Sequence, residues 1–260
     1  MEYPFTQVDA FADRPFTGNP AAVIPLESWM PDDMLQAIAM ENNLAETAFA
    51  VPSAENDADY DLRWFTPTVE VALCGHATLA SGHVLMDGEH VRFRTRQAGV
   101  LEVRRVGDGY ALSLPAYRAE PKPLPATVAA LGCEARETLW HEGRYGVVVL
   151  EDEAQVRAVA PDFRALAADA DVVTIIVTAP GRRTDVVSRV FVPGAGIDED
   201  PVTGAAHAVL TPYWTARLGR PQFTAFQASR RGGHLECRLA GDRAILGGRC
   251  VTVIEGVIRI

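Results

Sequence analysis

Two segments that lie about half a chain apart begin with the same pattern of small residues, and this repeat limits the fold more than any other feature. Residues 74–77 read Cys-Gly-His-Ala, and residues 203–206 read Thr-Gly-Ala-Ala. Each opens a run that is apolar nearly all round, which predicts buried helices over 75–86 and 204–218. We therefore expect two copies of one architecture, each a curved sheet wrapped around a buried central helix.

Short strands dominate the remaining sequence, because runs rich in β-branched residues alternate with turn residues. In the first half we predict strands over 5–11, 22–24, 47–51, 61–65, 91–95, 100–105 and 110–114. In the second half we predict strands over 145–150, 172–177, 185–191, 222–227, 234–238 and 251–258. Many strands and few helices indicate an α+β fold.

Prolines mark the remaining helix and the boundary between the two copies. A helix is predicted over 31–42, because Pro31 suits a first helical turn and an apolar stripe follows it. Pro212 is expected to bend or interrupt the second central helix. The proline-rich stretch around 115–125 is typical of a linker, so we expect domains over 1–116 and 117–250.

The charged residues exclude several classes of protein. Lys and Arg number 24 against 34 Asp and Glu, a formal net charge of −10 that repels a nucleic-acid backbone. The only lysine is Lys122, in the proline-flanked sequence EPKPLP. Schiff-base enzymes, P-loop nucleotidases and protein kinases all need a positioned lysine, so these classes are not expected.

The N-terminus and the cysteines indicate a cytoplasmic protein. The start, MEYPFTQVDAF, lacks the apolar core of a signal peptide. The longest aliphatic run, 172–179, is too short to cross a membrane. The four cysteines are widely spaced without a CxxC pair, so we expect neither a zinc site nor a redox motif.

The two glycine-led helix starts suggest an anion site. A helix N-terminus offers unpaired N–H groups and a partial positive charge, and glycine lets a ligand approach the backbone. If the two halves face each other, both starts would serve one small carboxylate. The alternative is that Gly75 and Gly204 only permit tight strand-to-helix turns.

Three polar residues near these starts are candidates for proton transfer. Glu46 stands at the edge of a predicted buried strand, a partly desolvated setting that suits a general acid or base. His76 follows Gly75 directly, and Asp200 lies in the acidic run before Gly204. Each also has a structural interpretation: a strand cap for Glu46, a core histidine for His76 and a solvated loop acid for Asp200.

Other chemistries are disfavoured by the residues. A two-thiol racemase needs cysteines at both repeat positions, but Cys74 is matched by Thr203, so we interpret Cys74 as a small buried residue. His76 and His83 share a helix face without a third ligand, so no metal site is predicted. The segment PGAGID lacks the third glycine of a dinucleotide site.

Four blocks stand out along the chain: FTGNPAAV (16–23), ENNLAETAF (41–49), RWFTPTVEVALCGHATLASGHVL (63–85) and GIDEDPVTGAAH (196–207). Together they resemble the PhzF family, named for an isomerase of phenazine biosynthesis. The resemblance implies a diaminopimelate-epimerase-like fold of two pseudo-symmetric domains, each a mostly antiparallel sheet rolled around a central helix. It also implies that the last strand, 251–260, returns to the first domain, and that the chain forms a homodimer.

The resemblance also implies a set of site residues. In the family's isomerase, a glutamate moves a proton between two carbons of a dihydro-hydroxyanthranilate, aided by a histidine and an aspartate. These roles fall on Glu46, His76 and Asp200. Substrate binding falls on Asn19, Gly75, Gly204 and Ala205. The family's isomerase has serine where this chain has Ala205, which puts the phenazine precursor itself in doubt as the substrate.

Residues and resemblance together predict a cofactor-independent isomerase that moves a proton between carbons of a small carboxylic acid. Glu46 would be the general acid and base, while His76 and Asp200 would orient the substrate or carry a second proton. Two alternatives stay open: an epimerase or racemase of a small amino or hydroxy acid, and a non-catalytic protein that binds small acids. A hydrolase or lyase is a weaker alternative, because the sequence offers no nucleophile.

Overall fold

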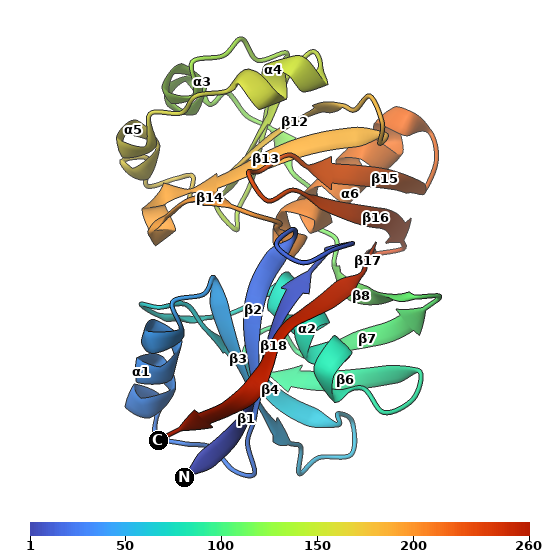
Figure 1. The fold of residues 1–260 in the computed structure, drawn as a ribbon. Helices are drawn as coiled ribbons and strands as arrows, with labels where there is room; N and C mark the ends of the chain where they lie inside the picture. Colours follow the sequence, from blue (N-terminus) through green and yellow to red (C-terminus); the bar gives the residue numbers. More distant parts are fainter. The chain divides into compact units, whose positions relative to one another are not determined.

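The strands and helices of the computed structural model, which describes residues 1–260, fall into two units. The first unit comprises Met1–Leu114 and Leu246–Ile260, and the second comprises Pro115–Ile245. Both are α+β, with sheets that outweigh the helices (Figure 1). None of the helices combines the length and the apolar character that a membrane-spanning helix requires.

The first unit is a curved sheet built around one helix. Its elements are β1 (Glu2–Ala10), β2 (Asn19–Pro25), α1 (Asp32–Asn42), β3 (Glu46–Pro52), β4 (Tyr60–Phe65), β5 (Glu70–Val71), α2 (Gly75–Leu85), β6 (His90–Thr95), β7 (Val100–Val106), β8 (Gly109–Pro115) and β18 (Cys250–Arg259). The strand order is β18-β1-β2-β3-β4-β6-β7-β8. The last strand, β18, pairs with the first strand, β1. The two ends of the chain therefore lie side by side in Figure 1.

The second unit repeats this plan. Its elements are β9 (Glu120–Pro121), α3 (Pro125–Leu131), β10 (Glu137–His141), β11 (Tyr145–Val149), α4 (Glu153–Ala158), α5 (Phe163–Ala167), β12 (Thr174–Pro180), β13 (Val186–Val192), the 3-10 turn η1 (Pro193–Ala195), β14 (Ile197–Asp200), α6 (Gly204–Leu218), β15 (Gln222–Gln227), β16 (Gly233–Ala240) and β17 (Arg243–Gly248). The first unit begins again within β17, at Leu246.

The two units share one order of strand pairing. In the first, β1–β2 is antiparallel, β2–β3 parallel, β3–β4 antiparallel and β4–β6 parallel. In the second, β10–β11 is antiparallel, β11–β12 parallel, β12–β13 antiparallel and β13–β15 parallel. In each unit a short strand and then the central helix precede the last parallel pairing. The repeat expected from the two small-residue segments is thus an internal repeat of topology.

The central helices are the most buried elements. All residues from Gly75 to Gly82 of α2 are buried, and α6 is buried along most of its length. Small side chains let the sheet close around these helices, since a Cβ on Gly82 would approach Val103 to within 2.5 Å. Apolar burial of this kind is the main stabilising contribution to each unit.

We expected Pro212 to bend or interrupt the second central helix, and it does not interrupt it. Helix α6 runs without a break from Gly204 to Leu218 with Pro212 inside it. Proline cannot donate to the carbonyl four residues earlier, which belongs to Ala208. The backbone N–H of Tyr117 donates to this oxygen at 3.2 Å instead. A partner from outside the helix therefore satisfies the carbonyl that the proline leaves open.

Several short elements escaped the sequence patterns. We did not predict five of these elements, because a segment of seven residues or fewer shows little hydrophobic periodicity. They are the strands β10 and β17 and the helices α3, α4 and α5. Helices α4 and α5 nevertheless carry clear start signals. The side chains of Asp152 and Asp162 cap them by accepting from the N–H groups of Gln155 and Ala165.

Candidate active site

Three elements of the first unit bring Asn19, Glu46 and His76 together. Asn19 begins β2, Glu46 begins β3, and His76 is the second residue of α2. The parallel register of β2 and β3 pairs Ala21 with Glu46, which places both strand starts at the same sheet end. The sequence folds this way because small residues at the start of α2 allow the helix to pack closely beneath the strands.

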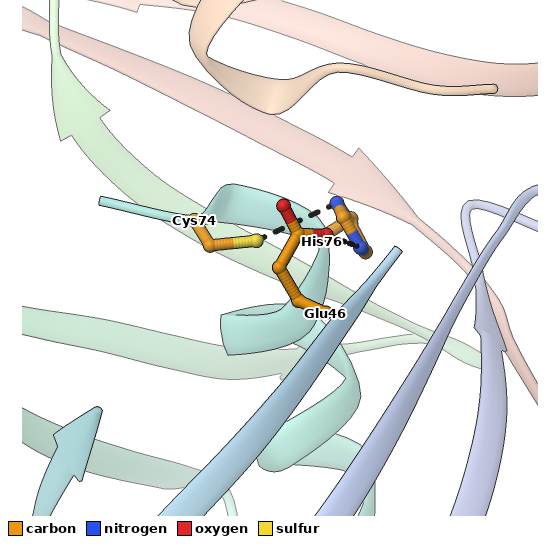
Figure 2. A group of neighbouring side chains, drawn as sticks. All are labelled: Glu46, Cys74 and His76. Carbon is orange, nitrogen blue, oxygen red and sulfur yellow. Dashed lines mark hydrogen bonds and ion pairs between the residues drawn. The ribbon is translucent and has the colours of Figure 1, made fainter. Parts of the chain in front are cut away.

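Glu46 and His76 form a close acid–imidazole pair. Oε2 of Glu46 lies 2.9 Å from Nε2 of His76, and the two side chains are only 14% and 4% exposed. Figure 2 shows both side chains and Cys74 pointing toward one another above the start of α2. Neither Oε2 nor Nε2 has an aligned hydrogen-bond partner, so the pair meets at ion-pair distance without ideal N–H···O geometry. Both atoms keep hydrogen-bonding capacity for a third group.

The other ring nitrogen of His76 faces an amide and a thiol. Nδ2 of Asn19 donates to Nδ1 of His76 at 3.1 Å, and Sγ of Cys74 lies 3.6 Å from the same nitrogen. A neutral ring that accepts at Nδ1 carries its proton on Nε2, toward Glu46. An amide can also turn its oxygen toward Nδ1, so Asn19 can serve the protonated ring as well.

Burial and the neighbouring groups shift the titration of this cluster. Burial opposes the charged ring, but Cys74 and Glu46 outweigh it and raise the pKa of His76 well above its usual value. Burial, together with Glu46, raises the pKa of the Cys74 thiol to about 11. Because Cys74 therefore stays a neutral thiol at neutral pH, it can support the charged ring only by accepting a hydrogen bond from Nδ1. The Glu46 carboxylate is then the charge that supports a proton on His76.

The first turn of α2 offers backbone donors beside this cluster. Cys74 is the N-cap residue, and its side chain makes no capping hydrogen bond. The first turn of the helix carries no acidic side chain that would neutralise its positive end. The backbone at Gly75 and His76 therefore combines open donor groups with a partial positive charge, which suits a carboxylate or a developing anion.

In the second unit, Asp200 is tied to the start of α6. Asp200 ends β14, and Thr203 precedes Gly204 as the N-cap residue. The Thr203 hydroxyl donates to Oδ2 of Asp200 at 2.5 Å and does not cap the helix. Gly204 is buried and Ala205 is partly exposed in the first helical turn. This helix start, like that of α2, is without a side-chain cap or an acid.

His207, one turn further along α6, is structural. Its Nδ1 donates to the carbonyl oxygen of Thr203 at 2.9 Å, and its Nε2 lies 3.3 Å from the hydroxyl of Ser188. Burial lowers the pKa of His207 to about 4, so the ring is neutral near neutral pH. Both ring nitrogens of His207 contact other groups of the protein, so the side chain has no polar atom left to bind a substrate.

The cluster in the first unit contains metal-ligand atom types. Three residues, Glu46, Cys74 and His76, each offer one ligand atom, and these three atoms lie within 4.8 Å of one another. A metal there would need the Cys74 thiolate and a free lone pair on His76. The raised thiol pKa and the Asn19 amide at Nδ1 both oppose this arrangement. The contacts fit a proton-transfer cluster better than a metal centre.

The site residues predicted from the sequence fall into two groups. Asn19, Glu46, Gly75 and His76 lie together in the first unit, and Asp200, Gly204 and Ala205 lie together in the second. Sequence reasoning missed the contact of Cys74 with His76, although its place two residues before the histidine was a signal. It also missed Gln227, whose side chain donates a hydrogen bond to the backbone carbonyl of Asp200. The strand that contains Gln227 carries no distinguishing motif.

Comparisons with known proteins agree with this architecture. The family model described as "Phenazine biosynthesis-like protein" (PhzC-PhzF) matches residues 8–114 and 134–256. A protein of Pseudomonas aeruginosa named as an uncharacterized isomerase is 48% identical over 266 residues, covering 100% of both chains. A PhzF-family phenazine biosynthesis protein of Enterococcus faecalis has a crystal structure with a TM-score of 0.93 and 45% identity, also covering 100% of both chains.

More distant structures share the fold alone. A hydroxyproline epimerase of Agrobacterium vitis, solved with bound trans-4-hydroxy-L-proline, has a TM-score of 0.61 at 14% identity. The match covers 99% of this chain and 92% of that chain. The family model spans most of the present chain, and the Pseudomonas relative spans all of it. The chain therefore belongs to the PhzC-PhzF family of phenazine biosynthesis-like proteins.

Proposed function

We propose that this isomerase moves a proton between carbon atoms of a small carboxylic acid without a cofactor, with Glu46 as the general acid and base. The observation that carries the proposal is the Glu46–His76 pair. Its two facing atoms lie 2.9 Å apart, are shielded from water and lack aligned hydrogen-bond partners. A shielded carboxylate of this kind can remove a proton from carbon and return it elsewhere.

The proposed reaction has two balanced steps. Glu46 first takes a proton from a carbon atom of the substrate, and the electron pair of that C–H bond delocalises into the adjoining unsaturated or carboxylate system. The resulting anion is stabilised by His76 and by the backbone donors at the start of α2. Glu46, now protonated, then gives the proton to a second carbon atom, so the product differs from the substrate only in the position of one proton and a double bond.

The substrate class follows from the donors at the helix starts. The backbone at Gly75 and, in the second unit, at Gly204 offers a partial positive charge without a competing acidic side chain. A small carboxylate is the ligand that suits this chemistry. We retain Asp200 as a further participant, because the resemblance assigns it a role in the same reaction.

The residue at position 205 restricts which substrates the site can bind. It is partly exposed in the first turn of α6 and has no hydroxyl to donate to or accept from a ligand. A serine at this place in the family's isomerase could contact a polar substituent that Ala205 cannot. We therefore propose a substrate other than the phenazine precursor.

Solvent isotope exchange tests the proposal directly. The protein is incubated in D2O with a panel of small cyclic, unsaturated and α-substituted carboxylic acids, and incorporation of deuterium at carbon is followed by mass spectrometry. We expect exchange with at least one acid in the wild-type protein and loss of at least ~100-fold in Glu46→Gln. Glu41→Gln is the matched control, because Glu41 is exposed near the end of α1.

Each result of this experiment has a clear meaning. Exchange that disappears only in Glu46→Gln supports proton transfer by Glu46. Exchange that persists in Glu46→Gln removes Glu46 from the role of base. A ligand that binds with undiminished affinity to Glu46→Gln while no acid exchanges would favour the non-catalytic binding protein.

Epimerisation is the second candidate, and one contact favours it. Inversion at one carbon needs a second proton-bearing group, and the neutral Cys74 thiol lies 3.6 Å from Nδ1 of His76. Incubation of one enantiomer of each exchanging acid distinguishes the two reactions. A racemic or epimeric product indicates epimerisation, and a shifted double bond with retained configuration indicates isomerisation.

A further inference from the structure

The side chain of Gln227 is fully buried, yet all its polar atoms are engaged on one short segment. It stands at the end of β15 and bonds only to residues between the end of β14 and the start of α6. Oε1 accepts from the backbone N–H of Thr203 at 2.8 Å. Nε2 donates to the carbonyl oxygen of Asp200 at 2.7 Å and to the hydroxyl oxygen of Thr203 at 3.2 Å.

These bonds fix the direction of a hydrogen-bond chain. An amide Nε2 can only donate, so the Thr203 hydroxyl accepts from Gln227 and keeps its own proton free. That proton is donated to Oδ2 of Asp200. The chain therefore runs from Gln227 through Thr203 to the Asp200 carboxylate. A donor at this carboxylate favours its ionised form.

The strand that carries Gln227 is itself held firmly. Gln227 pairs with Ser188 of the parallel strand β13 and with Gly233 of the antiparallel strand β16. A fully bonded amide on a central strand is a rigid support, because moving it would leave several buried groups unsatisfied. The loop between Asp200 and Gly204 has no comparable backbone ladder of its own.

We propose that Gln227 is a positioning residue for Asp200: through Thr203 it orients the carboxylate and keeps it an acceptor for the substrate. This inference rests on the proposed function, in which Asp200 takes part in the reaction. Gln227 touches no reacting atom in this scheme. Its effect passes through the hydroxyl and backbone of Thr203 and through the backbone carbonyl of Asp200.

The first test needs no substrate. The titration midpoint of the Asp200 carboxyl is measured by NMR of the carboxyl carbons, with Asp200→Asn to assign the signal. We expect Gln227→Met, which keeps the chain length and removes every hydrogen bond, to raise the midpoint by about half a unit or more. Thr203→Val should do the same, and Thr203→Ser, which keeps the hydroxyl, should stay near the wild type.

This test includes a control variant and a replacement variant. Gln222→Met is the matched control, because Gln222 lies on the same strand but is exposed. If Gln227→Met does not fold, Gln227→Glu replaces it, since it keeps the oxygen that accepts from Thr203 and loses the donor once it is ionised. An Asp200 midpoint that stays at the wild-type value in the folded Gln227 variant overturns the proposal, whatever the thermal stability does.

The second test measures the turnover of an acid that exchanges in D2O. We expect Gln227→Met to lower kcat about 10-fold or more and to change KM less, because the carboxylate is displaced during the reaction. A proportional loss of active protein, with unchanged KM and pH profile, would mean a merely structural role. If no acid exchanges, the proposed function fails, but the NMR titration still decides whether Gln227 governs Asp200.

Discussion

Asn19 and His76 lie 57 positions apart in the sequence, and the amide Nδ2 of Asn19 lies 3.1 Å from Nδ1 of His76. This bond occupies the ring nitrogen that faces away from Glu46. It leaves Nε2 as the nitrogen that meets Oε2 of Glu46 at 2.9 Å. The orientation of His76 on α2, and hence of the acid–imidazole pair, therefore depends on a residue of strand β2.

Removing the Asn19 amide should slow proton transfer. Asn19→Leu leaves Nδ1 of His76 without its amide partner, so the ring is free to turn away from Glu46. We expect kcat for deuterium exchange to fall about 10-fold or more. Asn42→Leu is the control, since Asn42 bonds Thr47 and does not touch His76. Equal rates in wild type and Asn19→Leu would contradict this role.

The protonation of His76 should depend on Glu46. The pKa of His76 is raised, so the charged ring persists to higher pH than usual and is lost as the pH rises through this value. In Glu46→Gln the supporting charge is gone while burial remains. We expect the pKa of His76 to fall by about 1–3 units, measured by NMR of the imidazole nitrogens. A His76 titration that is the same in both proteins would show that Glu46 does not govern it.

His207 should destabilise the protein in mild acid. Burial lowers its pKa to about 4, below the ordinary value of 6.5, so the unfolded chain binds a proton that the folded chain refuses. Stability is therefore lost as the pH falls from 6.5 toward 4, by roughly 3 kcal/mol in total. Urea unfolding across this range should show a shallower pH dependence in His207→Asn, which keeps a donor for Thr203. An identical slope in the variant would refute this assignment.

Arg63 should be important for the stability of the first unit. Its side chain is 4% exposed, bonds both oxygens of Glu70 and reaches Asp32 at the start of α1. Arg63→Met removes the bidentate partner of Glu70, which keeps only the exposed Arg96, and we expect a loss of about 2–4 kcal/mol in the free energy of unfolding. Arg104→Met is the control. Arg104 pairs with Glu102 at the surface, where such pairs contribute about 0–1 kcal/mol.

Exchange activity should be independent of metal ions. The Glu46–Cys74–His76 cluster could act as a metal centre only after loss of the thiol proton, and the raised pKa of Cys74 opposes that loss. We therefore expect dialysis against EDTA to leave the rate of deuterium exchange unchanged. A rate that falls on chelation and returns on addition of Zn²⁺ would instead identify the cluster as a metal site.

Local sequence patterns were sufficient for the main elements. The two small-residue starts predicted the central helices at Gly75 and Gly204, and β-branched runs predicted most of the strands. The same patterns did not predict that α6 continues without a break through Pro212, because the carbonyl that the proline leaves open is satisfied by Tyr117, far outside the helix. They also missed short elements such as β10 and α4, which are held by neighbouring strands or by a single cap.

The sequence by itself determined the family, the α+β fold and the candidates Glu46, His76 and Asp200, because motifs and hydrophobic periods are properties of neighbouring residues. Only the tertiary structure decided that Asn19 and Cys74 meet His76 and that Gln227 supports Thr203 and Asp200. These contacts are set by strand register and by the depth at which a helix is buried. No local preference encodes such quantities, since they arise when distant segments pack together.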